Sequence, residues 1–139
     1  MRLNVRAVIV RDGLLLVSSE ERHGVNRPFL PGASVRDREP VVEALTRGVR
    51  EDLGVEVIPR QLLYVAEVIG VYGVHDLNLV WLADLLEPDA PLDGLATVPL
   101  DGDRGYAILP PLIEEIVADA ANEFDNAPRW LGNVGRSYL

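Results

Sequence analysis

The stretch that decides the fold runs from residue 30 to residue 55 and reads LPGASVRDREPVVEALTRGVREDLGV. A stiff proline–glycine approach leads into a segment whose apolar residues recur at helical spacing. Pro40 suits the first position of a helix with Glu39 at its cap, and Gly54 suits the stop. The segment therefore predicts one amphipathic helix over residues 40–53. Its buried stripe is expected to comprise Val42, Leu45, Val49 and Leu53.

On the N-terminal side of this helix the sequence predicts a β-hairpin. Apolar residues alternate with polar ones over residues 3–10, which is typical of a strand. Asp12-Gly13 is a strong signal for a tight turn, and the apolar run of residues 14–17 returns as a second strand. Residues 18–27 are polar, and we expect a loop there.

On the C-terminal side the pattern predicts further strands and one more helix. A second amphipathic pattern begins at Pro110 or Pro111, and residues 125–139 show no period, so this tail packs either on the domain or on a partner. Together the elements predict one mixed sheet covered by helices on its faces. The expected strands span residues 55–58, 62–71, 77–86 and 96–100, with a turn over residues 72–76.

Length and composition limit the class of protein. A chain of 139 residues without cysteine predicts a single domain, residues 1–139, with no disulfide and no thiolate metal site. A net charge of −9 argues against a nucleic-acid polymer as partner. No apolar run is long enough for a membrane span and no secretion signal is present, so a cytoplasmic location is expected. A small anionic nucleotide remains a suitable ligand if divalent cations lie between its phosphates and protein carboxylates.

Residues 33–55 resemble the Nudix box, the motif GX5EX7REUXEEXGU in which U is a bulky aliphatic residue. Asp52 stands in for a motif glutamate, Ala33 replaces the opening glycine, and Gly48 replaces the glutamate after the motif arginine. The resemblance implies an α/β/α sandwich with a mixed β-sheet. It also implies a hydrolase that cleaves the pyrophosphate link of a nucleoside diphosphate derivative. The matching positions are Glu39, Arg47, Val49, Glu51, Gly54 and Val55.

The resemblance also assigns roles to the acidic residues of the helix. Glu51 and Asp52 are implied as catalytic residues and as ligands of Mg²⁺ or Mn²⁺, which prefer carboxylate oxygens. Gly48 removes the third acid of the group, so weaker metal binding is expected. A glutamate restored at this position is expected to raise metal affinity. Such a glycine in a helix is explained by close backbone approach, by relaxed selection on the acid, or by chance.

Other charged residues receive a secondary role. Glu39 and Arg47 are implied as the structural ion pair of the motif. Arg27 lies in the polar loop before Leu30-Pro31-Gly32, where it is either a phosphate-binding residue or a solvent-exposed one. Glu43 is the nearest acid that could replace the missing ligand. Alternatively Glu43, Arg47 and Glu51, spaced four residues apart, form a surface ladder of ion pairs.

Two functions remain open at this stage. The first is a metal-dependent Nudix pyrophosphohydrolase acting on a small nucleotide, weakened by Gly48. The second is a catalytically inactive Nudix-fold module that binds a nucleotide or a protein. The intact pair Glu51 and Asp52 favours the enzyme, and Gly48 favours the binding module. The resemblance leaves a homodimer open as the assembly.

Overall fold

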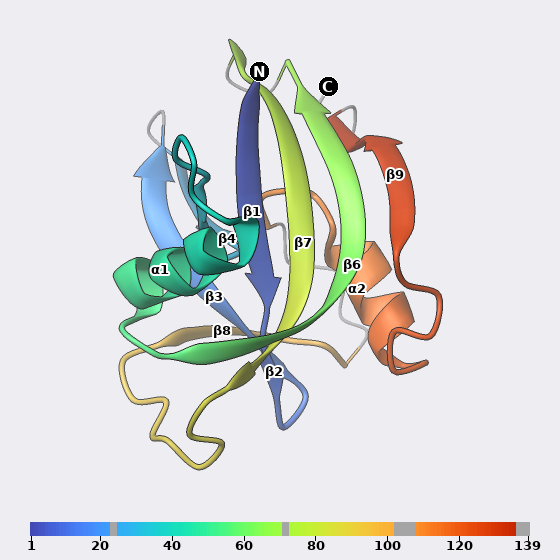
Figure 1. Ribbon diagram of the computed structural model, residues 1–139. Helices are drawn as coiled ribbons and strands as arrows, with labels where there is room; N and C mark the ends of the chain where they lie inside the picture. Colours follow the sequence, from blue (N-terminus) through green and yellow to red (C-terminus); the bar gives the residue numbers. More distant parts are fainter. Residues whose placement is uncertain (23–24, 71–72, 102–107, 136–139) are drawn as a thin grey trace.

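A five-stranded mixed sheet forms the centre of the computed structural model (Figure 1), which describes residues 1–22, 25–70, 73–101 and 108–135, with the backbone alone for residues 20–22 and 25–27. Its strand order is β5-β1-β7-β6-β9. β1 pairs in parallel with β7 and antiparallel with β5, while β6 pairs antiparallel with β7 and in parallel with β9. The strands are β1 (Arg2–Val8), β5 (Gly32–Ser34), β6 (Val57–Ile69), β7 (His75–Leu85) and β9 (Arg129–Asn133).

A smaller antiparallel sheet adjoins the central one. β2 (Val10–Arg11) and β3 (Leu14–Arg22) are joined by the predicted turn, where Asp12 and Gly13 have φ angles of 54° and 76°. β3 also pairs with β4 (Val25–Phe29) and with β8 (Ala96–Pro99).

One helix covers each face of the central sheet (Figure 1). α1 (Val41–Leu53) packs Ala44, Leu45 and Val49 into one buried cluster, and α2 (Ile113–Ala120) packs Ile113 and Ile116 into the other. This confirms the predicted mixed sheet flanked by helices. α1 is capped by Pro40 rather than Glu39, and it ends as predicted at Gly54, whose φ is 70°.

Two sequence-based predictions about the strands were wrong, and one further strand was not predicted. Residues 18–22 and 25–27 lie in the paired strands β3 and β4 and not in a loop, because backbone pairing rather than an apolar period holds that ladder. Pro59 does not end a strand, since it sits beside a register shift within the continuous strand β6. Residues Arg129–Asn133 of the tail form β9 beside β6, so this part of the tail packs on the domain, which is one of the two alternatives left open by the sequence.

The tail is held in place by a buried polar cluster. The Tyr64 hydroxyl donates to Asp119 of α2 at 2.6 Å, and Arg129 of β9 pairs with the same carboxylate. The Arg129 guanidinium also lies 5.6 Å from the centre of the Tyr64 ring. Burial, and next the bond to Asp119, raise the pKa of the Tyr64 hydroxyl.

In the described part of the chain no helix is both long and apolar enough to span a membrane.

Candidate active site

The loop before α1 is fastened to the helix by an ion pair between Glu39 and Arg47. Arg47 Nε and Nη2 donate to the two carboxylate oxygens of Glu39, each at 2.9 Å. Arg47 Nη2 also donates to the backbone oxygen of Ser34 at 3.0 Å, and Glu39 accepts from the backbone N–H of Arg36 at 3.1 Å. These contacts fix both ends of the loop that connects β5 to α1.

The same contacts shift the acidity of both partners. The hydrogen bond from Arg47, followed by the backbone bond from Arg36, lowers the pKa of Glu39 to about 2. The bond to Glu39 in turn raises the pKa of the Arg47 guanidinium. The pair therefore stays ionised across the physiological range.

Gly48 packs directly against the backbone of β5. A Cβ atom added at this position would lie 2.3 Å from the carbonyl carbon of Gly32 and 2.7 Å from the backbone nitrogen of Ala33. Close backbone approach is therefore the physical reason for a glycine inside α1. A glutamate cannot be added here without moving β5, whereas the expected gain in metal affinity stays a prediction.

Asp52 is tied to the same strand. Its Oδ2 accepts a hydrogen bond from the backbone N–H of Gly32 at 3.0 Å, and the residue is half-buried. Glu51 is its neighbour on the helix but lies at the surface, where 55% of its side chain is exposed. Arg47 Nη1 lies 3.3 Å from Glu51 Oε2, so the arginine that pairs with Glu39 in the loop also contacts this acid. Two carboxylates in different environments thus lie one helical turn after the buried Gly48.

The remaining predicted residues lie outside this arrangement. Glu43 is exposed in the first turn of α1, and of the predicted ladder the described contacts include only the Arg47–Glu51 step. At a rise of 1.5 Å per residue, Glu43 lies about 12 Å from Glu51 along the helix axis, too far to share one ion. Arg27 belongs to β4 opposite Glu20, but its side chain is outside the described residues. Nowhere in the described ranges do three or more His, Cys, Asp or Glu side chains gather as a metal site.

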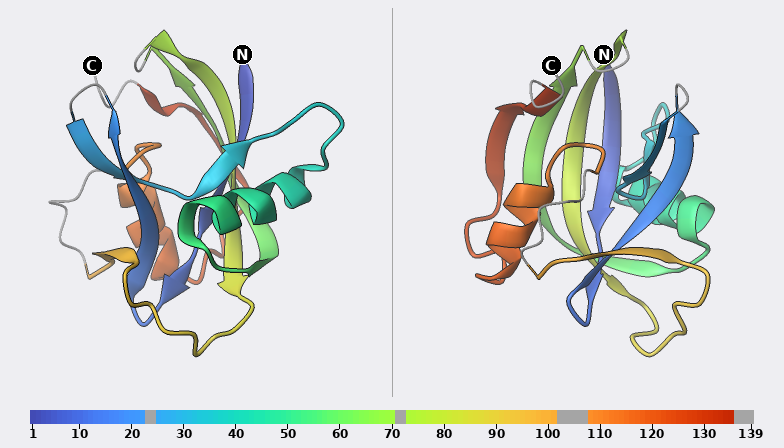
Figure 2. Two further views of the ribbon diagram at one scale, coloured as in Figure 1. Left: turned by 90° about the vertical axis from the view of Figure 1, so that its left-hand side faces the viewer. Right: turned by 180° about the vertical axis from the view of Figure 1, so that it is seen from behind.

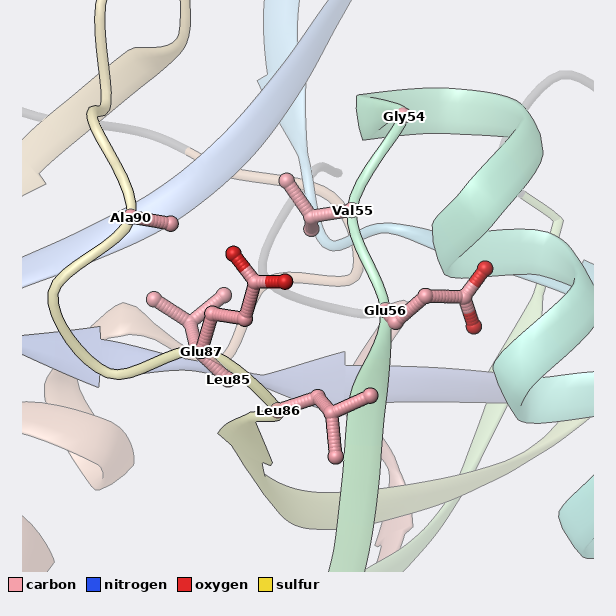
Figure 3. Close-up of a pocket in the computed structure, with 7 residues that line it drawn as sticks. All are labelled: Gly54, Val55, Glu56, Leu85, Leu86, Glu87 and Ala90. Atoms are coloured by element: carbon pink, nitrogen blue, oxygen red, sulfur yellow. The ribbon is translucent and has the colours of Figure 1, made fainter.

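Two cavities open beyond the C-terminal end of α1. The first, of about 230 Å³, is shown in Figure 3, where the Glu87 carboxylate points toward Val55 and the Glu56 carboxylate points toward α1. Glu56 is bound by Arg50 at 2.5 Å, and that hydrogen bond lowers its pKa. The second cavity, of about 390 Å³, shares Leu85 and Leu86 with the first. Neither cavity is lined by Glu51 or Asp52, so these acids face a different part of the surface.

Sequence analysis left close backbone approach at Gly48 as one of three explanations without its partner, and it missed the bond from Gly32 to Asp52. The contact of Gly48 with β5 and the bond from Gly32 to Asp52 both join residues that are distant in sequence. The available signal was Gly48 itself. A glycine weakens a helix by roughly 0.5–1 kcal/mol relative to alanine, so its presence indicates a position where a small residue is needed.

Comparison with known proteins places the fold in one family. No family model matches the sequence, and neither does any curated protein. Among solved structures, a MutT Nudix hydrolase from Burkholderia pseudomallei is 32% identical, with 72% of this chain and 84% of that chain covered and a TM-score of 0.59. A Nudix hydrolase from Nitrosomonas europaea is 22% identical, with 88% and 89% covered and a TM-score of 0.71. An ADP-ribose pyrophosphatase from Streptococcus suis is 19% identical, with 95% and 97% covered and a TM-score of 0.56.

Proposed function

This chain belongs to the Nudix hydrolase family, and we propose that it hydrolyses the pyrophosphate link of a nucleoside diphosphate derivative with a divalent metal ion. The observation that carries the proposal is the pair of adjacent carboxylates Glu51 and Asp52 on α1. Glu51 contacts Arg47, which also pairs with Glu39 in the preceding loop, and Asp52 accepts from the N–H of Gly32. The structurally similar ADP-ribose pyrophosphatase acts on a substrate of this class, which supports the choice of substrate.

The two carboxylates suit Mg²⁺ or Mn²⁺ in a particular way. Nudix hydrolases generally use divalent metal ions, and Mg²⁺ is commonly held by one or two carboxylates together with substrate phosphates and water. Glu51 is accessible and Asp52 is half-buried beside it, so together they supply such a partial set. A bound ion would neutralise charge on the phosphoryl oxygens and lower the barrier to attack by water.

The chain's own residues would orient these ligands. The N–H of Gly32 holds Asp52 Oδ2, and Arg47 holds Glu51 while it remains clamped to Glu39. Orientation by neighbouring hydrogen bonds is a common way in which proteins tune metal ligands. Arg47 also competes with a cation for the Glu51 carboxylate, so we expect weak metal affinity in the absence of substrate. The missing third acid at position 48 acts in the same direction.

Phosphate or nucleoside monophosphate release tests the proposal directly. A panel of nucleoside triphosphates, dinucleoside polyphosphates and nucleotide sugars would be assayed with Mg²⁺ and then with Mn²⁺. Asp52→Asn keeps an oxygen to accept from Gly32 and removes only the charge, so a loss of about 100-fold or more is expected. Glu51→Gln should also reduce turnover, whereas Glu43→Gln serves as the matched helix control and should leave it unchanged.

A second function is favoured by the Gly48 contact. The backbone of β5 occupies the space beside position 48, so the family's third acid is absent and its place is filled. A Nudix-fold module that binds a nucleotide or a protein without cleavage would have this property. No turnover above that of Asp52→Asn with any substrate in the panel, for a folded protein, would favour this module over the hydrolase.

A further inference from the structure

The second cavity, of about 390 Å³, lies at the end of the molecule opposite the N-terminus. In both views of Figure 2 the β2–β3 turn and the loop that follows β7 lie at this end. The cavity is lined by residues of β2, β6, β7 and this loop. Its volume falls within the range of about 300–1,000 Å³ that is typical of small-molecule sites.

Three exposed aliphatic side chains gather in this cavity. Val10 is 37% exposed, Ile58 48% and Leu86 54%. Ile58 is the register partner of Asp84, and the N–H of Leu86 donates to the backbone oxygen of Glu56, so the pairing of β6 with β7 brings two of the three together. Single exposed apolar residues need no explanation, whereas a concave cluster of them indicates a binding site. The cavity therefore suits a ligand with an aliphatic body.

Arg11 places a fixed positive charge at the same cavity. Its Nη1 donates to the backbone oxygens of Pro88 at 3.0 Å and Ala90 at 2.5 Å, which holds the guanidinium against the loop after β7. Within the described part of the chain, Nε and Nη2 have no acceptor, and no carboxylate pairs with this arginine. The Nε and Nη2 groups form a planar fork that matches the two oxygens of a carboxylate.

The other charged residue that lines the cavity is already paired. Asp84 lies 2.5 Å from Arg60, so Arg11 is left as the unmatched charge among the described lining residues. The first cavity differs, because it is lined by the acids Glu56 and Glu87 (Figure 3). In a chain with a net charge of −9, an anion would therefore bind in the second cavity and not in the first.

We propose that the second cavity binds a small aliphatic carboxylate, with its chain on the three exposed aliphatic residues and its carboxylate on Nε and Nη2 of Arg11. The cavity has the size of a small-molecule site, whereas a stable protein interface needs about 800 Å² from each partner. A free small molecule is therefore the expected occupant. This inference goes beyond the proposed function and does not depend on it, because the acids of α1 do not line this cavity.

Calorimetric titration with octanoate tests the proposal. The titration would use metal-free buffer and octanoate below the concentration at which it forms micelles. Octanoate should bind at least about tenfold more tightly than octan-1-ol, which has no charge, and than acetate, which has no chain. Because it binds the folded protein, octanoate should also raise the melting temperature.

Two variants test the head group and the chain separately. Arg11→Gln removes the charge and should reduce the affinity for octanoate to that for octan-1-ol. Ile58→Thr keeps a β-branched residue at an exposed position of β6, so it should weaken octanoate about threefold or more without changing the melting temperature. Arg38→Gln and Ile69→Thr are the matched controls, since they change an exposed arginine and an exposed isoleucine outside the cavity.

The outcomes decide the proposal in either direction. Weaker octanoate binding in both Arg11→Gln and Ile58→Thr, with both controls unchanged, would uphold the site. No binding of octanoate, equal affinity for octanoate and octan-1-ol, or binding that survives either cavity variant would overturn it. An equal loss of binding in the control variants would also overturn it. Turnover in the substrate panel tests the proposed function alone, so the two proposals can fail independently.

Discussion

The two halves of the motif segment are held in different ways. The N-terminal half is closed by the clasp of Glu39, Arg47 and Ser34, in which both carboxylate oxygens of Glu39 are bound. In the C-terminal half the backbone of β5 fills the space beside Gly48, and two acids remain at or near the surface. The difference teaches that the contacts that hold a motif segment in place can be complete while its set of acidic residues is reduced.

Substitution at Gly48 should have the largest effect on stability. Gly48→Glu places a side chain against the backbone of Gly32, so we expect the free energy of unfolding to fall by about 3 kcal/mol or more. Urea denaturation measures this. Gly54→Ala is the matched control, because Gly54 has a φ of 70° but open space around it, and it should cost about 1–2 kcal/mol. A Gly48→Glu protein as stable as the parent would refute the close contact.

The clasp should reveal itself through pH. Because the folded protein lowers the pKa of Glu39 to about 2, the ionised form stabilises the native state. Stability lost in Glu39→Gln should therefore be constant above pH about 5. The difference from the parent should shrink as the pH falls from about 4 toward 2, when Glu39 takes up a proton. Thermal unfolding measured across this pH range tests this, with the exposed Glu43→Gln as control. If the Glu39–Arg47 pair were absent, the stability difference between Glu39→Gln and the parent would not shrink at low pH.

Replacement of Asp52 should separate its structural bond from its charge. Asp52→Ala leaves the N–H of Gly32 without this acceptor and should lower the free energy of unfolding by about 1–2 kcal/mol. Asp52→Asn keeps an acceptor oxygen and should cost less. Equal losses in the two variants, measured by denaturation, would mean that the charge and not the hydrogen bond stabilises this end of α1.

Glu51 should show the smallest effect on stability. Its side chain is 55% exposed and pairs with Arg47 four residues earlier, an arrangement that contributes about 0.3–0.5 kcal/mol. The free energy of unfolding of Glu51→Gln, measured by urea denaturation, should therefore lie within about 0.5 kcal/mol of the parent value, while its turnover falls. A large loss of stability would mean that Glu51 supports the folded structure and is not mainly a metal ligand.

The local pattern predicted much of the fold. Helical spacing located α1, Gly54 located its end, and Asp12-Gly13 located the first turn, because each signal is contained within a few residues. β9 escaped prediction because its position depends on Arg129 meeting Tyr64 and Asp119, which are separate in sequence.

The site followed the same rule. The partners Glu39 and Arg47 lie eight residues apart, and the motif places them together. The contact between α1 and β5 depends on tertiary packing, so no spacing within the helix could reveal that position 48 has no room for a side chain.

The most direct test of the central claim is a magnesium titration of thermal unfolding, with and without a nucleoside diphosphate. If two carboxylates form only a partial site, Mg²⁺ alone should stabilise the protein little. Mg²⁺ with the nucleotide should stabilise it beyond the nucleotide alone, and Asp52→Asn should abolish that increment. Equal stabilisation by Mg²⁺ with and without nucleotide would contradict the account by requiring a complete protein site. No increment under any condition would contradict it by removing the metal from these two acids.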